Sequence, residues 1–255
     1  MYLKQTPVKS NQEVIAGIHL LTLESSEIAS SARPGQFVML SCDYGKEHLL
    51  RRPLSIHQVD GSTVSFLFAV TGEGTEWLAQ RQAGDKISWL GPLGNGYKIN
   101  SESRNLLLVA GGMGLPPLCF LASHAMKKGH SVKLLIGAKT VSQLCPTGII
   151  PVAAAAVTAT EDGSAGEKGL VTDLLVEHLD WADQVFACGP LPMYRTMVKE
   201  ARLLNKPVQL SLEVRMGCGL GFCYACTIRT IHGLKQVCKD GPVFNLHDIP
   251  WDELE

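Results

Sequence analysis

Short apolar runs separated by turn residues fill the first hundred residues of the chain. The runs are β-prone segments at residues 35–40, 54–56, 64–70 and 86–90. Asp60-Gly61, between the second and third runs, is typical of a tight hairpin connection. One short helix is expected around residues 75–82. This pattern predicts a small antiparallel β-barrel.

From residue 105 the pattern changes to buried strands that alternate with amphipathic helices. Residues 106–110 form a continuous apolar run, as expected of a strand buried on both faces of a parallel sheet. The alternation then continues with a helix up to Met126, strands at 132–136 and 185–187, an apolar stretch at 149–159, and helices at 170–179 and 193–204. We therefore predict a doubly wound α/β domain.

The bulk composition indicates a folded protein whose partners are small molecules and proteins. The 255 residues suit two compact domains and a smaller appendage. A net charge of −1 without a dense Lys/Arg block gives no electrostatic footprint for nucleic acid or an anionic membrane. The N-terminus lacks the order of a signal peptide, and glycines and prolines interrupt the most apolar stretch, 106–122. We expect a cytoplasmic protein without a membrane span.

Four of the eight cysteines crowd the last quarter of the chain. Cys218-x4-Cys223-x2-Cys226, followed after eleven residues by Cys238, is the plant-type ferredoxin spacing for a [2Fe-2S] cluster. Three glycines among these ligands allow backbone N–H groups to turn toward an anionic cluster. A structural zinc site is the alternative, but zinc usually takes two short Cys-x2-Cys arms and only one is present. The spacing therefore favours the cluster.

Two motifs of the predicted α/β domain follow buried strands, where such sheets bind nucleotides. Residues 111–117, Gly-Gly-Met-Gly-Leu-Pro-Pro, separate a strand from a helix whose first N–H groups can hold a pyrophosphate. Cys188-Gly189-Pro190 ends another strand. The first motif departs from Gly-x-Gly-x-x-Gly, so an ordinary tight turn is the alternative there, as a packing cysteine is at Cys188.

A third motif lies in the predicted barrel. Arg51-Arg52-Pro53-Leu54-Ser55 precedes a strand, and Gly72-Glu73-Gly74-Thr75 opens the following helix. An arginine beside a glycine-rich helix N-terminus can neutralise a diphosphate from two sides. A solvated basic pair with a flexible loop is the alternative.

These motifs in this order resemble the ferredoxin reductase superfamily: Arg-x-x-Ser in a barrel, Gly-Gly-x-Gly-x-x-Pro, then Cys-Gly-Pro. Residues 215–226 and 237–244 look like one branch in particular, the electron-transfer subunits of the NAD-dependent, two-subunit dihydroorotate dehydrogenases. The resemblance covers essentially the whole chain. It implies an antiparallel β-barrel FAD domain (1–100), a doubly wound α/β NAD domain (101–208) and a small C-terminal [2Fe-2S] domain (209–255).

The resemblance also implies which residues bind each cofactor. For FAD these are Arg52, Pro53, Leu54, Ser55, Leu67, Phe68, Ala69, Gly74 and Thr75. For NAD(H) they are Gly111, Gly112, Gly114, Cys188 and Gly189, and for the cluster Cys218, Cys223, Cys226 and Cys238. Leu54 stands where many superfamily members carry an aromatic residue, so ring stacking on the flavin from that position is absent.

The implied function is electron transfer from NADH through FAD and the cluster to an FMN-containing dihydroorotate dehydrogenase catalytic subunit, as a heterotetramer in pyrimidine biosynthesis. No side chain is expected to act as a general acid or base, because the cofactors carry the chemistry. A single lysine, Lys139, is a poor clamp for a 2′-phosphate, which favours NADH. Two alternatives remain: a reductase component of a hydrogenase, transhydrogenase or oxygenase, and a non-enzymatic nucleotide-binding module with a structural zinc.

Overall fold

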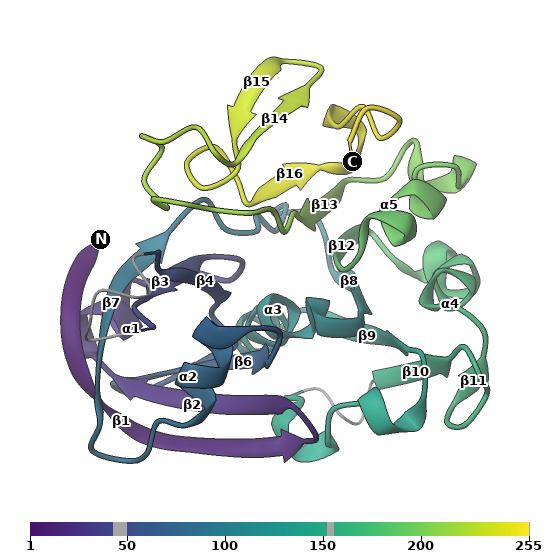
Figure 1. Ribbon diagram of the computed structural model, residues 1–255. Helices are drawn as coiled ribbons and strands as arrows, with labels where there is room; N and C mark the ends of the chain where they lie inside the picture. Colours follow the sequence, from purple (N-terminus) through teal and green to yellow (C-terminus); the bar gives the residue numbers. More distant parts are fainter. Residues whose placement is uncertain (43–49, 152–155, 255) are drawn as a thin grey trace.

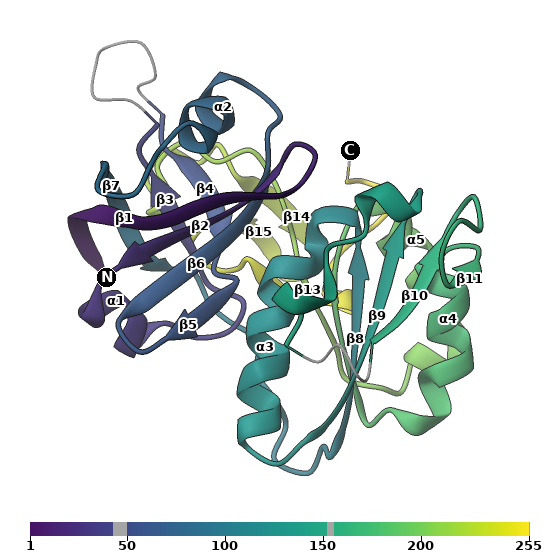
Figure 2. The same ribbon diagram turned by 90° about the horizontal axis from the view of Figure 1, so that it is seen from below.

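The computed structural model describes residues 1–42, 50–151 and 156–254, in three parts that pack against one another (Figure 1). A curled antiparallel sheet lies beside a parallel sheet that carries helices on both faces (Figure 2). The C-terminal residues form a loop and a hairpin across the top of both. The predicted fold class is confirmed.

Within the described residues, the curled sheet has seven strands. In spatial order they are β4 (Arg52–Ser55), β3 (Phe37–Leu40), β7 (Lys86–Leu93), β1 (Tyr2–Ile15), β2 (Ile18–Glu24), β6 (Thr63–Ala69) and β5 (Gln58–Asp60). The two edge strands, β4 and β5, are consecutive in the chain, because only Ile56 and His57 separate them. The sheet therefore curls back on itself as a half-barrel. Helices α1 (Ser26–Ser31) and α2 (Glu73–Ala79) complete this part.

The hairpin of β1 and β2 was not predicted from the sequence. The first half of β1 pairs with β7 and its second half pairs with β2, so this strand joins the two sides of the half-barrel. Val8 is the one fully buried side chain of β1. Backbone pairing with two neighbours holds the strand, and its polar sequence carries no apolar alternation to reveal it.

The parallel sheet follows the predicted alternation. Across the described part of the chain its strands lie in the order β11 (Glu167–Lys168), β10 (Ala156–Thr160), β9 (Ser131–Ala138), β8 (Asn105–Gly111), β12 (Gln184–Cys188), β13 (Val208–Ser211) and β16 (Val243–Asn245), with β16 antiparallel to β13. Helix α3 (Leu115–Lys127) covers one face, and α4 (Val171–His178) and α5 (Leu191–Met197) cover the other (Figure 2). Part of the predicted apolar stretch 149–159, residues 152–155, lies outside the described residues.

Helix α5 is shorter than the predicted helix over 193–204. It ends at Met197, where the N–H groups of Lys199 and Glu200 bond to carbonyls three residues earlier. Thr196 Oγ1 also donates to the Pro192 carbonyl at 3.1 Å, a side-chain bond that competes with regular helix geometry. Leu204, predicted on the apolar face, is 62% exposed. The prediction for the second half of this helix was wrong.

The C-terminal part shares its core with the other two. Its hairpin, β14 (Thr227–Thr230) and β15 (Gly233–Gln236), stands beside the loop that holds the four clustered cysteines. One apolar cluster contains Phe37 and Met39 of the half-barrel, Leu210 of the parallel sheet and Val237 of the C-terminal part. The predicted domain limit at 208/209 falls inside β13, and the domain limits stay a prediction. No helix in the described ranges is long and apolar enough to span a membrane.

Candidate functional site

A pocket of about 520 Å³, here called the barrel pocket, opens where the three parts meet. Most of the predicted flavin contacts line it: Arg52, Pro53, Leu54, Ser55, Leu67, Phe68, Ala69 and Thr75. The facing wall consists of residues 211–216, which follow β13, with Met113 and Pro116 from the start of α3. Packing of the half-barrel against the parallel sheet thus brings distant segments to one cavity.

Arg52 lies against the first turn of α2. A Cβ atom at Gly74 would be 2.6 Å from Arg52 Nε, so only glycine admits the guanidinium at this distance. Thr75 Oγ1 accepts the N–H groups of Thr71 at 2.9 Å and Gly72 at 3.2 Å, which fixes the loop before the helix. The Arg52 guanidinium and the first turn of α2 therefore lie side by side in the pocket wall, an arrangement that suits a diphosphate.

Arg51 has a different role from its neighbour. Its guanidinium donates to the Ser88 carbonyl and to Ser88 Oγ, both at 2.9 Å, and so binds β7. Burial lowers the pKa of Arg51, and the nearby Cys42 partly opposes this. Of the two arginines, only Arg52 lines the barrel pocket.

A second pocket, of about 420 Å³, lies at the carboxyl edge of the parallel sheet and is called the strand-edge pocket. Of the residues predicted to bind NAD(H), Gly111 and Gly112 line it, whereas Gly114, Cys188 and Gly189 do not. Its other lining residues include Gly137, Lys139, Gln143, Glu161, Thr172, Pro190 and Met193. This edge is where open α/β sheets bind their ligands.

The two glycine motifs meet beside this pocket. A Cβ atom at Gly114 would lie 1.9 Å from the Cys188 carbonyl oxygen and 2.7 Å from the Gly189 nitrogen. One at Gly111 would lie 2.9 Å from both Met193 Sδ and Pro190 Cδ. The glycines of the first motif therefore allow direct backbone contact with the second motif.

Two polar groups of the strand-edge pocket were missed by the sequence analysis. Glu161 follows β10, and its N–H donates to the Ala138 carbonyl at 3.1 Å. An acidic residue directly after a buried strand was the available signal. Thr172 Oγ1 is buried and has no hydrogen-bond partner among the described residues. The pocket thus offers a bound nucleotide a carboxylate and an unsatisfied hydroxyl.

Between the two pockets lies a group of buried polar side chains. The Cys188 thiol is fully buried beside Tyr194 and Ser211, and this burial raises the pKa of Cys188. Glu213, in the wall of the barrel pocket, follows this group two residues after Ser211 and is itself exposed. Tyr194 and Glu213 were not singled out in the sequence, since neither belongs to a motif.

The four clustered cysteines come together in two pairs. Cys218 contacts Cys223, and Cys226 contacts Cys238, through their side chains. Among the described residues, no three His, Cys, Asp or Glu side chains converge as ligands of a single metal ion. Two pairs of thiolates fit a [2Fe-2S] cluster, in which each iron takes two of the four sulfurs. A single tetrahedral zinc would need all four at one point.

Backbone amides point at the sulfurs, as a cluster requires. Leu220 N and Phe222 N donate to Cys218 Sγ at 3.3 and 3.4 Å, and Gly221 N donates to Cys238 Sγ at 3.2 Å. Gly221 reaches this orientation with a φ of 81°. Desolvation raises the pKa of Cys218, but these N–H donors outweigh it and lower the pKa to about 6. The loop thus favours a thiolate at Cys218, whereas desolvation, with Cys226 beside it, raises the pKa of Cys238 to about 12.

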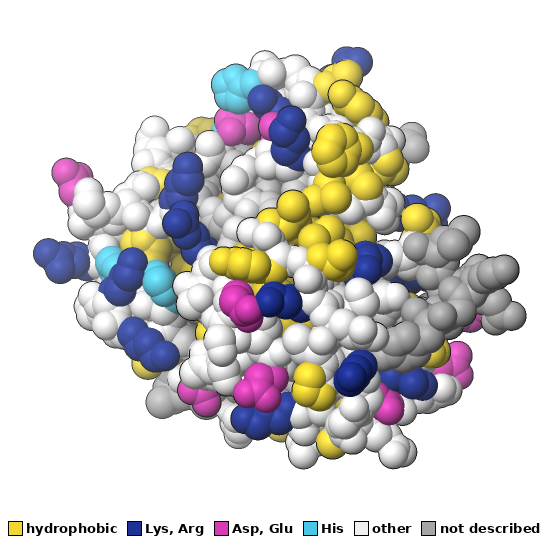
Figure 3. Space-filling model, turned by 90° about the vertical axis from the view of Figure 1, so that its left-hand side faces the viewer, with side chains coloured by type: hydrophobic (Ala, Val, Ile, Leu, Met, Phe, Trp, Pro, Cys, Tyr) yellow, Lys and Arg dark blue, Asp and Glu magenta, His cyan; other side chains and the backbone are white. Residues whose placement is uncertain are grey.

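The cysteine loop connects the barrel pocket to the surface. Met216 lines the pocket and Cys218 follows two residues later. A Cβ atom at Gly219 would be 2.6 Å from Met39 Cγ, so the loop rests on the half-barrel. On its outer side Phe222 is 78% and Tyr224 70% exposed. Figure 3 shows hydrophobic side chains gathered in a band on this side of the molecule.

Comparisons with known proteins agree with this geometry. Residues 213–250 match the family model of the iron-sulfur cluster binding domain of dihydroorotate dehydrogenase B. A dihydroorotate dehydrogenase B (NAD(+)), electron transfer subunit from Desulforamulus reducens is 37% identical over 251 residues, covering 94% of this chain and 95% of that protein. A protein of the same description from Bacillus cereus (strain 03BB102) is 38% identical over 259 residues, covering 98% and 99%.

Solved structures share the fold. A structure of the NADH-dependent reduced ferredoxin-NADP oxidoreductase, concerned with flavin-based electron bifurcation, superposes with a TM-score of 0.87 at 28% identity and covers 98% of this chain and 91% of that one. A ferredoxin NADP+ reductase from Neisseria gonorrhoeae with bound FAD and NADP gives a TM-score of 0.65 at 15% identity, over 84% and 94%. The second likeness concerns the fold alone.

Proposed function

Because the chain belongs to the family of electron transfer subunits of NAD(+)-dependent dihydroorotate dehydrogenase B, we propose that it carries electrons from NADH through FAD and a [2Fe-2S] cluster to the catalytic subunit of such an enzyme. The observation that carries this proposal is the path of residues 211–218. This one segment forms a wall of the barrel pocket and then supplies the first cysteine of the cluster loop.

The barrel pocket is the proposed flavin site. Arg52, with Gly74 and Thr75, binds the diphosphate, and Leu54 and Ser55 lie along the ring system. Residues 67–69 form the other side of the site. When bound, FAD supplies the conversion between the two electrons of a hydride and the single electrons that a [2Fe-2S] cluster accepts. The chain itself orients the cofactors and excludes water from the space between them.

The strand-edge pocket is the proposed NADH site. Gly111 and Gly112 admit the dinucleotide near the start of α3, while Cys188 ends β12 and Gly189 follows it, beside the segment that begins the wall of the flavin site. Glu161 supports NADH over NADPH, because a carboxylate accepts a hydrogen bond from a ribose 2′-hydroxyl and repels a 2′-phosphate. Lys139 lines the same pocket as Glu161 and carries the opposite charge.

The partner in this proposal is an FMN-containing dihydroorotate dehydrogenase catalytic subunit, in a heterotetramer with two copies of each chain. The binding face is the outer side of the cysteine loop, where Phe222 and Tyr224 offer exposed aromatic anchors of the kind found at interface centres.

Co-expression with an FMN-containing catalytic subunit tests this function. We expect one complex in gel filtration at micromolar concentration and reduction of orotate by NADH. Phe222→Ala and Tyr224→Ala should weaken the complex while iron content stays intact. Leu204→Ala is the matched control, since this side chain is also exposed and precedes the start of β13, whereas the loop follows the end of that strand. Separate elution of the two chains, with no orotate reduced, would refute the assignment.

A reductase serving another acceptor is the second candidate, supported by the similarity to the ferredoxin-NADP oxidoreductase structure. It predicts the same visible spectrum and the same NADH-dependent bleaching of the flavin. It differs in its acceptor, because reduction of a ferredoxin would replace reduction of orotate. An anaerobic NADH titration with each acceptor in turn separates the two.

A further inference from the structure

The hydroxyl group of Tyr194 joins two segments that lead to the two pockets. The N–H of Gly189 donates to Tyr194 Oη at 2.9 Å, and Tyr194 Oη donates to the Ser211 carbonyl at 2.8 Å. Gly189 directly precedes Pro190, which lines the strand-edge pocket, and Ser211 begins the wall of the barrel pocket. One oxygen atom therefore bridges the two segments at the point where β12 and β13 stop pairing, at Cys188 and Ser211.

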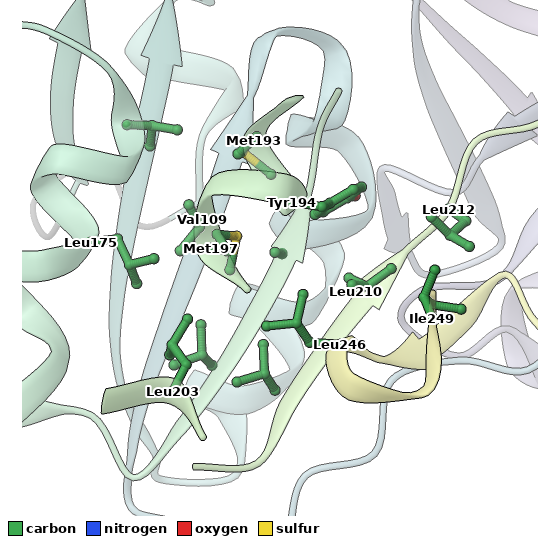
Figure 4. Packing of buried hydrophobic residues seen from close by; sticks show 14 of the residues in the cluster. Val109, Leu175, Met193, Tyr194, Met197, Leu203, Leu210, Leu212, Leu246 and Ile249 are labelled. Atoms are coloured by element: carbon green, nitrogen blue, oxygen red, sulfur yellow. The ribbon is translucent and has the colours of Figure 1, made fainter. Parts of the chain in front are cut away.

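The position of this hydroxyl is itself fixed by packing. The Tyr194 side chain is 1% exposed, and its ring lies 5.3 Å from that of Trp251 in the C-terminal segment. Arg195 Nε holds that segment by donating to the Trp251 carbonyl at 3.2 Å. Figure 4 shows Tyr194 among the buried residues of α5 and β13, near Met193 and Leu210. The ring cannot move without disturbing this core.

A second buried tyrosine provides the contrast. Tyr97 is also almost fully buried, and its hydroxyl donates to the Ala187 carbonyl at 3.0 Å. Its ring meets Phe186 edge to face. This bond attaches the segment after the half-barrel to β12, one residue before Cys188, and no backbone N–H of the described residues donates to the Tyr97 hydroxyl. A merely structural hydroxyl has this pattern.

We propose that Tyr194 is a positioning residue for hydride transfer. By bonding the backbone at Gly189 to the backbone at Ser211, it fixes how far the nicotinamide side of the site lies from the flavin side. This inference rests on the proposed function, because it assigns NADH to one pocket and FAD to the other. A misplacement of about 1 Å between reacting groups can cost on the order of a hundredfold in rate.

The first test needs no cofactor turnover. Residue-resolved amide hydrogen exchange is measured on the parent, Tyr194→Phe and Tyr97→Phe. We expect the Gly189 amide to exchange about tenfold faster in Tyr194→Phe, because it loses its acceptor, and to be unchanged in Tyr97→Phe. Equal protection of Gly189 in all three proteins would overturn the proposal.

The second test follows flavin reduction by NADH in stopped flow, per bound flavin, with the charge-transfer absorbance of the NADH complex as a separate readout. Tyr194→Phe should lower the limiting rate about tenfold to hundredfold. It should weaken the charge-transfer band and change the Kd for NADH by less than about threefold. Tyr97→Phe should match the parent. An unchanged rate in Tyr194→Phe, or an equal loss in both variants, contradicts the proposed role.

Failure of the proposed function gives a different result, since the parent protein itself would then show no flavin reduction by NADH. If Tyr194→Phe does not retain FAD, Trp251→Leu replaces it. Trp251 packs against the Tyr194 ring and lines neither pocket, so this change removes packing from the ring without altering a pocket wall. It should lower the same limiting rate of flavin reduction by about threefold or more. An unaltered rate in Trp251→Leu would then refute the positioning role.

Discussion

The contact between the two glycine motifs makes Gly114→Ala a sharp test of the site. The added Cβ would lie 1.9 Å from the Cys188 carbonyl oxygen, more than 1 Å inside the ordinary contact distance of about 3.5 Å. Gly114 has a φ of −72°, which alanine adopts readily, so the effect is steric. The obstructing atom belongs to the backbone of a buried strand end and cannot rotate away.

Overpacking of this kind costs about 1–3 kcal/mol, and the helix propensity of alanine over glycine returns at most about 1 kcal/mol. The steric contribution therefore dominates. With the added Cβ only 1.9 Å from a backbone oxygen, the cost lies at the upper end and the net loss is about 2 kcal/mol, so we expect the melting temperature to fall by roughly 4–8 °C, at about 2–4 °C per kcal/mol for a chain of this size. Because the start of α3 must move from Cys188, kcat/KM for NADH in a dye-reduction assay should fall about tenfold or more.

Gly148→Ala is the control, because a Cβ there meets nothing within 4 Å. Thermal unfolding and NADH-to-dye kinetics are measured on both variants and the parent at equal FAD content. Gly148→Ala should melt within about 1 °C of the parent, as expected for an uncrowded surface change. If Gly114→Ala behaves like Gly148→Ala in both assays, the close backbone contact does not constrain the site.

Three further predictions concern the cofactors. Cys226→Ser should remove the visible absorbance of the cluster and abolish partner reduction while NADH-to-dye activity survives, because the two pockets do not include this residue; loss of both activities in a folded variant would contradict this. Arg52→Ala should weaken FAD binding roughly ten- to hundredfold, the equivalent of a charge-assisted hydrogen bond of about 1.5–3 kcal/mol, and unchanged flavin content after gel filtration would show that the diphosphate lies elsewhere. Glu161→Gln should raise kcat/KM for NADPH about tenfold, a gain of about 1.4 kcal/mol, with Glu167→Gln on the neighbouring edge strand as the unaffected control; equal NADPH kinetics in both variants would exclude Glu161 from nucleotide choice.

Local patterns in the sequence predicted those parts of the structure that depend on neighbouring residues alone. The buried run of β8 predicted a central parallel strand, because a strand covered on both faces must be apolar throughout. The cysteine spacing predicted that Cys218, Cys223, Cys226 and Cys238 come together at one loop, since a short loop around two irons allows few arrangements. The Asp60-Gly61 turn between β5 and β6 was equally local, and Gly61 adopts a φ of 56°.

Other features depend on contacts between distant segments, and no local pattern records them. The polar strand β1 exists because β7 and β2 pair with its two halves. The division of the cysteines into two pairs, and the placement of Glu213 in the barrel pocket, follow from how the C-terminal loop packs on the half-barrel.

The link between the two pockets is the clearest case of a feature decided by tertiary structure. In the sequence, Tyr194 is one apolar position of a helix whose predicted end was wrong. In the fold, its hydroxyl lies between Gly189 and Ser211, because α5 packs across the strand ends and the C-terminal segment holds the ring in place. A hydrophobic pattern specifies that a side chain is buried, whereas the neighbours of its polar atom are set by which elements the chain brings together.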